Sequence, residues 1–206
     1  MTQNNRMADE ERILQRYEEF FGNLDKESDR GCVLVAGAIL DNHLEMLLRA
    51  EFSQDATVVK RVINPLFKGQ GPLASFWSKT QLAYSLDLIP EWMYEDLERI
   101  RELRNEFAHR YKAVDFKDPA VVRLTEKLKG ANYAVRSLRA SSNAPKDRQS
   151  AHTSPAAVPV IPKKERVRFI LTASWIAGCM HPGAELSELK RKILSLHGFK
   201  RLWDDR

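Results

Sequence analysis

The sequence predicts an all-α fold: a helical bundle, then a flexible linker and a small C-terminal helical segment. Through most of the chain, apolar residues recur every three or four positions, which is the spacing of one face of an α-helix. No stretch of useful length alternates apolar and polar residues, as a half-buried strand would. Proline and glycine interrupt the pattern between the apolar runs, and both residue types break helices.

Two helices are predicted in the first part of the chain. Residues 9–21 carry apolar side chains at helical spacing, and Gly22-Asn23 then ends the pattern. A longer helix is predicted from Ser28, a residue type that caps helix N-termini, through the apolar run that ends at Phe52. The small residues around Gly37 in this run would let another helix approach closely.

Proline and glycine divide the next part of the chain. A short helix is predicted before Asn64-Pro65, and the "FKGQGPL" that follows is interpreted as a turn because it lacks the Lys-Ser/Thr of a phosphate-binding loop. A new helix is predicted to open near Pro72, since proline suits the first helical turn. After Pro90, residues 91–111 predict a helix of about five turns with an apolar inward stripe. The face of the helix after Pro72 is assigned to Leu73, Phe76 or Trp77, Thr80, Ala83 or Tyr84, and Leu86.

The chain is divided by composition into a domain, a linker and a tail. A helical domain is predicted over 9–135, closed by a helix in "DPAVVRLTEKLK". Residues 136–164 are predicted to be a linker, because their later part is rich in Pro, Ser and Ala and almost free of large apolar residues. A C-terminal helical segment is predicted over 165–206, in two stretches split at His181-Pro182-Gly183.

The composition is that of a globular protein with no export or membrane signal. Of the 206 residues, 43% are hydrophobic and 30% charged. The N-terminus is polar and acidic, and no run reaches the ~18 apolar residues of a membrane span, so we expect a cytoplasmic protein without a membrane partner. The net charge of +5 is a mild excess that permits a nucleic-acid partner without arguing for one.

No metal or cofactor site is predicted. Cys32 and Cys179 are far apart and have no zinc-ligand spacing, so neither a disulfide framework nor a zinc site is indicated. Asp41 and Glu45 share a helix face, but His43 points ~200° away from Asp41, which argues against a metal triad there.

The candidate chemistry lies in "RELRNEFAHR", residues 101–110. On a helix Arg101, Asn105 and His109 share one face, while Arg104 lies to the side and five residues before His109. Histidine transfers protons near neutral pH and arginine binds phosphate oxygens, so the set suits metal-free cleavage of a phosphodiester by a ribose 2′-OH. One intact helix cannot easily bring Arg104 to His109, so such a site requires a frayed helix end or a second copy.

The same residues also have a purely structural interpretation. Arginine, asparagine and histidine near a helix C-terminus stabilise the macrodipole and the free carbonyl groups of the last turn. The residues alone leave both interpretations open.

A set of short motifs occurs in a specific order and spacing through the middle of the chain. They are Pro65-Leu66, Gly69, Gly71-Pro72-Leu73, Ala83-Tyr84, Leu88-Ile89, Tyr94-Glu95-Asp96 and Leu103-Arg104. Through these motifs, the segment from Ser28 to about Leu128 resembles the mannitol operon repressor family. The resemblance covers about half of the chain, so the linker and the C-terminal helices look like additions of this protein. It implies an all-helical regulator without a DNA-binding motif, and therefore a regulatory protein partner.

The core also resembles the HEPN class of helical domains, whose signature is an arginine followed four to six residues later by histidine. Arg104-Asn105 and His109 match that signature. The resemblance implies a homodimer in which both sets face one groove, with His109 as general acid or base, Arg104 as phosphate stabiliser and Asn105 as orienting residue. A metal-independent endoribonuclease is therefore the alternative function.

The C-terminal segment adds a possible nucleic-acid contact. Its basic residues are interleaved with aromatic ones, as in proteins that grip an RNA or DNA backbone without reading its sequence. A solvated helix face with an apolar seam for a partner helix is the other interpretation. The basic residues are Arg166, Arg168, Lys190, Arg191, Lys192, Lys200 and Arg201.

Overall fold

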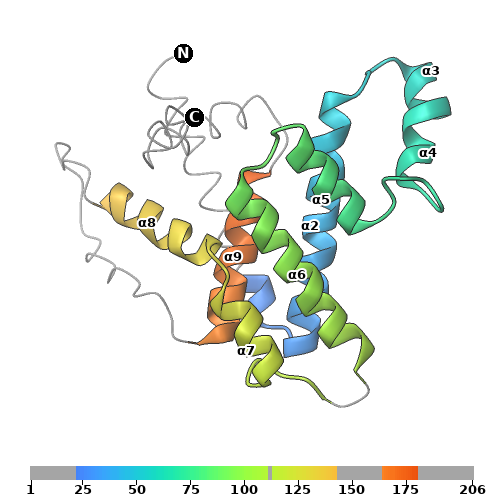
Figure 1. Cartoon of the computed structure of the whole chain (residues 1–206). Helices are drawn as coiled ribbons and strands as arrows, with labels where there is room; N and C mark the ends of the chain where they lie inside the picture. Colours follow the sequence, from blue (N-terminus) through green and yellow to red (C-terminus); the bar gives the residue numbers. More distant parts are fainter. Residues whose placement is uncertain (1–21, 111–112, 143–163, 181–206) are drawn as a thin grey trace.

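A computed structural model of the chain describes residues 22–110, 113–142 and 164–180 (Figure 1). Within these ranges every regular element is a helix, which confirms the predicted all-α fold. The predicted helix at 9–21 lies outside the described residues, as does the part of the C-terminal segment beyond residue 180. Residues 22–25 are helical and Leu24 is fully buried, so the first helical pattern does not end at Gly22-Asn23 as predicted.

Helix α2 (Asp29–Glu51) is the central element. The Ser28 hydroxyl accepts a hydrogen bond from the Gly31 amide at 3.0 Å, which confirms the predicted N-cap. Its apolar side faces α5 (Phe76–Ser85), α6 (Glu91–His109) and α9 (Glu165–Cys179). Contrary to the sequence-based expectation, α2 is long and apolar enough to pass as a membrane span by composition. Its fully buried side chains belong to the hydrophobic core of the bundle, which accounts for that composition.

A short helical arm leaves the bundle after α2. It consists of α3 (Ala56–Val58), a π-helical turn (Val59–Ile63) and α4 (Asn64–Phe67), and it projects from the bundle at the upper right of Figure 1. We call residues 56–67 the arm. Arg49 of α2 holds its base: the guanidinium donates to Asn64 Oδ1 at 2.9 Å and lies 4.4 Å from the Phe67 ring centroid.

The turn that returns from the arm to the bundle depends on two glycines. Gly69 has a φ of 58°, which lies in the left-handed region that glycine adopts without steric cost. A Cβ on Gly71 would lie 2.2 Å from the Pro65 carbonyl oxygen, so the close backbone approach excludes any side chain. The predicted turn is therefore present. The helix does not open near Pro72, however, because the Leu73 amide bonds back to the Leu66 carbonyl, and α5 begins only at Phe76 with Ser75 as its cap.

The remaining helices close the bundle around α2. Helix α6 matches the predicted helix at 91–111, and α7 (Pro119–Glu126) follows with Asp118 as its N-cap. Helix α8 (Gly130–Ser142) runs through residues 136–142, which were predicted to begin the linker. No proline or glycine lies between Gly130 and Pro145, so nothing in the sequence stops α8 at 136.

Helix α9 is part of the same core. It packs against α8, α2 and α7, and Phe169, Ile170 and Ile176 are fully buried in one cluster with the side chains of α2 and α6. Arg166 pairs with Asp29 and donates to backbone carbonyls just before α2. The first part of the C-terminal segment, α9, therefore packs as one of the helices of the bundle.

Candidate functional site

The end of α6 carries the residues that the sequence singled out. Helix α6 ends at His109, and Arg110 is already extended, so the helix ends where the sequence predicted fraying. Asn105 and His109 are exposed. The Arg110 carbonyl accepts a hydrogen bond from Arg30 at 2.8 Å, and the Arg110 guanidinium lies 3.1 Å from the Asp118 carboxylate. The last turn of α6 is therefore held to α2 and α7 by charged side chains.

Arg104 does not lie with His109 on that exposed end. A Cβ on Gly37 would lie 2.1 Å from Arg104 Cδ, so the arginine crosses α2 in the space that the glycine leaves. Its guanidinium carbon lies 5.4 Å from the Phe76 ring centroid of α5. Positions 104 and 109 are about 140° apart around the helix. Within one chain Arg104 packs α6 against α2 and α5, and a joint site with Asn105 and His109 stays a prediction that requires a second copy.

Asp41 and Glu45 of α2 form ion pairs with a buried lysine. Lys79 of α5 is only 2% exposed, and its Nζ lies 2.8 Å from Asp41 and 3.5 Å from Glu45. His43 instead bonds through Nδ1 to the Ile39 carbonyl of its own helix. No group of three or more potential metal ligands occurs among the residues that the structure describes.

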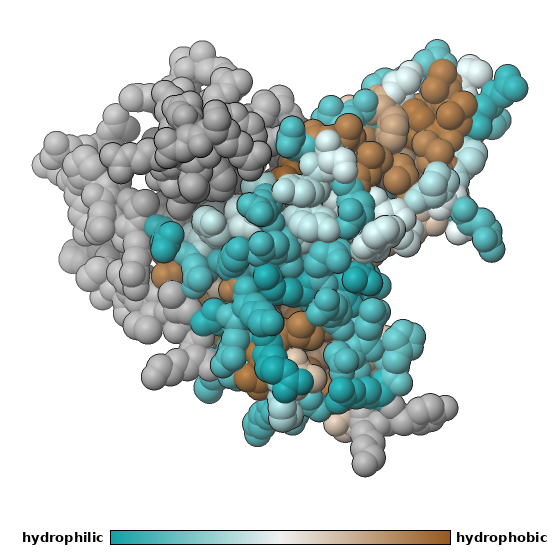
Figure 2. Space-filling model, viewed as in Figure 1, coloured by the Kyte–Doolittle hydropathy of each residue, from teal (hydrophilic) through white to brown (hydrophobic). Residues whose placement is uncertain are grey.

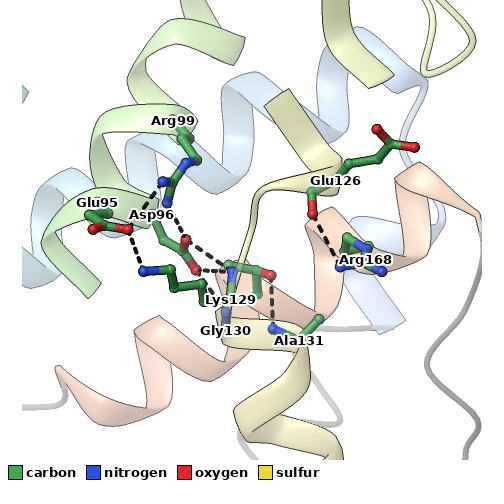
Figure 3. A network of polar contacts seen from close by, with 9 residues as sticks. Glu95, Asp96, Arg99, Glu126, Lys129, Gly130, Ala131 and Arg168 are labelled. Atoms are coloured by element: carbon green, nitrogen blue, oxygen red, sulfur yellow. Dashed lines mark hydrogen bonds and ion pairs between the residues drawn. The ribbon is translucent and has the colours of Figure 1, made fainter. Parts of the chain in front are cut away.

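A second polar network surrounds the buried carboxylate of Asp96 (Figure 3). Asp96 accepts hydrogen bonds from the backbone amides of Lys129 at 2.9 Å and Gly130 at 2.7 Å, and Arg99 donates to it at 3.0 Å. Burial raises the pKa of this carboxyl, against the opposing effect of the amides and Arg99. Because the two amides open α8, Asp96 of α6 caps that helix from outside, and the network is structural.

The α9 end of this network is also structural. The Ala131 amide donates to Thr172 Oγ1 of α9 at 3.0 Å. Arg168 donates to the Glu126 carbonyl at 3.4 Å (Figure 3). Arg166 and Arg168, two of the cations assigned to a nucleic-acid contact, therefore serve the bundle, and the other five lie outside the described residues.

The two cysteines offer no reactive thiol. Both are free, and burial raises the pKa of each thiol to about 12. A thiol with such a pKa is almost entirely protonated near neutral pH, and only the thiolate is a good nucleophile or metal ligand.

Large apolar side chains are exposed along α5 and just beyond it. Trp77 is 48% exposed, Tyr84 36% and Leu86 48%. Trp77 and Tyr84 are seven residues apart and so lie on one side of α5. Tyr84 stacks on Tyr94 of α6 at 4.5 Å between ring centroids, and Gln81 donates to the Tyr94 hydroxyl at 2.6 Å. We call Trp77, Tyr84 and Leu86 the α5 surface.

The sequence did not separate this surface from the core. Phe76 or Trp77, and Ala83 or Tyr84, were assigned to the inward face as alternatives, and Leu86 was placed there outright. The structure buries Phe76 and Ala83 and exposes the α5 surface. Two neighbouring apolar residues fit the same helical period equally well, so periodicity alone could not decide. Aromatic and apolar side chains exposed together are typical of interaction sites.

Comparison with known proteins assigns the fold to a family. The family model described as mannitol repressor matches residues 14–171. The chain belongs to the mannitol repressor family. This match confirms the resemblance seen in the sequence. It extends past Leu128 through α8 and the predicted linker to residue 171 in α9, so the chain up to that residue lies in the family region rather than in an addition.

Individual members of the family share a modest sequence identity with the chain. The mannitol operon repressor of Escherichia coli K12 is 27% identical over 124 residues, which cover 58% of this chain and 64% of the relative. The chain thus spans less than two thirds of the length of the curated relatives that it matches.

Two solved structures share the fold of this mannitol repressor family member. A possible transcriptional regulator, YggD, from Shigella flexneri 2a superimposes with a TM-score of 0.54 at 20% identity, covering 84% of this chain and 98% of that one. The MtlR–HPr complex from Escherichia coli gives a TM-score of 0.54 at 24% identity, covering 82% and 96%.

Proposed function

We propose that the chain is a cytoplasmic regulator of the mannitol repressor type that acts by binding a protein partner through the α5 surface. The observation that carries this proposal is the exposure of Trp77, Tyr84 and Leu86 on one helix and the turn after it. Tryptophan and tyrosine are enriched among the residues that dominate binding energy at protein interfaces. Membership of the family supports the regulatory role.

The α5 surface is well suited to docking because its support is rigid. Phe76, Thr80 and Ala83 bury the opposite side of α5 in the core, and the buried Lys79 pairs with α2. A surface held in this way loses little conformational entropy when a partner binds.

HPr is the first partner to test, because a relative with this fold was solved in a complex with it. Titration calorimetry of the full chain with HPr from Escherichia coli should show saturable binding. Replacing Trp77 and Leu86 together by alanine should weaken binding at least about tenfold. Val35→Ala, which shortens another exposed apolar side chain on α2, should leave the affinity for HPr unchanged. Absence of binding, or equal binding by all three proteins, would contradict the proposal.

A further inference from the structure

The arm and α6 carry exposed charges of opposite sign, and several of these charges form no ion pair within the described part of the chain. From Ala56 to Leu86 the sequence contains no carboxylate. Its cations Lys60, Arg61 and Lys68 are exposed, and none forms an ion pair with another described residue. The fourth cation of this stretch, Lys79, is buried against Asp41 and Glu45. Every charged side chain that the arm exposes is therefore basic.

The arm also exposes apolar side chains between its cations. Val58 is 36% and Val62 55% exposed, and Figure 2 shows hydrophobic side chains gathered on the arm at the upper right. The arm is fixed at its base by Arg49 and by the edge-on contact of Phe52 with Phe67, with ring centroids 6.0 Å apart. A fixed, basic and partly apolar projection is a feature that a complementary acidic surface can bind.

Such an acidic surface lies on α6 of the same chain. Carboxylates recur along one side of the helix at spacings of three or four residues. We call them the α6 stripe: Glu91, Glu95, Glu98, Glu102 and Glu106. Three of them pair with neighbouring cations, whereas Glu91 and Glu102 are exposed and form no ion pair with another described residue. No ion pair joins the arm to the stripe within the described chain.

We propose that the arm of one copy docks on the α6 stripe of a second copy. Glu91 and Glu102 are about 16 Å apart along α6, and Lys60 lies about 10 Å along the arm from Phe67, which directly precedes the exposed Lys68, if the arm is treated as helical. The lysine and arginine side chains are long enough to make up the difference between these two spacings. In this contact the exposed cations pair with Glu91 and Glu102 of the other copy, and Val58 and Val62 become buried. A nucleic acid would neutralise the arm but would leave Glu91 and Glu102 of the stripe without a partner, whereas a second copy supplies cations to them, which favours a second copy as the occupant. In a twofold dimer the contact forms twice.

Sedimentation equilibrium of the full chain tests this proposal through charge reversal. At about 100 µM and low salt the wild type should sediment with twice the 23.7 kDa mass of one chain, and the dimer should weaken as salt rises. Lys60→Glu with Arg61→Glu should weaken the dimer at least about tenfold, and Glu91→Lys with Glu102→Lys should do the same. Combining the four substitutions should restore affinity to within about threefold of the wild type.

The controls separate docking from a loss of fold. All four positions are exposed, so circular dichroism and thermal unfolding should be unchanged. Val62→Asp should weaken the dimer, whereas Val35→Asp on α2 should not. A monomeric wild type, or a dimer that either reversal leaves intact, would overturn the proposal. So would two reversals that each weaken the dimer without mutual rescue. HPr binding is measured separately, so either proposal can fail without the other.

Discussion

Replacing Asp96 by alanine should destabilise the protein strongly, although the residue lies in a helix rich in exposed carboxylates. The change leaves the buried Gly130 amide and the Lys129 amide without an acceptor and leaves Arg99 without its 3.0 Å partner. An unsatisfied buried donor costs about 1–3 kcal/mol. The Gly130 amide is buried and the Lys129 amide is partly buried, so together they give a loss of about 2–6 kcal/mol, with little added for Arg99 because it is partly exposed.

The neighbouring Glu95 provides the matched control. It lies 3.1 Å from Arg99 and 2.6 Å from the Lys129 ammonium, but its side chain is 31% exposed, and exposed pairs contribute about 0–1 kcal/mol. Urea unfolding of Asp96→Ala and Glu95→Ala should therefore separate the two clearly. Hydrogen exchange should also show faster opening at the start of α8 in Asp96→Ala. A loss below about 1 kcal/mol for Asp96→Ala would refute the role of this carboxylate as the external cap of α8.

Burial raises the pKa of Asp96 in the folded state, so the stability that its carboxyl contributes is present below the pKa of the unfolded chain and is lost as pH rises through the pKa of the folded protein. The free energy of unfolding of the wild type, relative to that of Asp96→Asn, should therefore fall as pH rises from about 4. A difference that does not depend on pH would contradict this. Gly37→Ala should lower the free energy of unfolding, measured in urea, by about 1–3 kcal/mol, because the new methyl group clashes with Arg104. The same substitution should lower it clearly less in an Arg104→Ala background. Equal losses in both backgrounds would refute the packing of Arg104 against Gly37. Because the thiol pKa of both cysteines is raised to about 12, Cys32 and Cys179 should resist alkylation in the native protein near neutral pH and react fully in urea. Rapid labelling of the native protein would contradict these raised pKa values. RNA incubated with the chain in EDTA should remain intact with wild type and His109→Ala alike, and cleavage that only the wild type performs would favour the ribonuclease alternative.

The helices of this fold follow closely from the sequence because they depend on local patterns. Ser28 caps α2 and the glycines of "FKGQGPL" form the turn, since both act within a few residues of their own position. Gly37 was predicted to allow close approach of another helix, and the structure fills the space beside it with a side chain of α6. The side chain that fills the space, Arg104, was not predicted, because no local pattern connects positions so far apart in the chain.

The parts that the sequence missed depend on contacts between distant segments. Asp96 resembles its acidic neighbours on α6, and only the placement of Lys129 and Gly130 distinguishes it as buried. Helix α9 follows a segment with a linker-like composition, so its burial against α2 was not evident. The exposure of Trp77 was ambiguous because the adjacent Phe76 satisfies the same helical period.

The most direct test of the proposed function is amide chemical-shift mapping of the isotope-labelled chain during titration with HPr. If the chain regulates by binding a protein on the α5 surface, the largest shifts should fall within residues 76–86 and at Tyr94, which stacks on Tyr84. The Trp77 indole signal should move with them, and α7 should remain unperturbed. Shifts confined to α7 and α9, or no shifts at saturating HPr, would contradict the account.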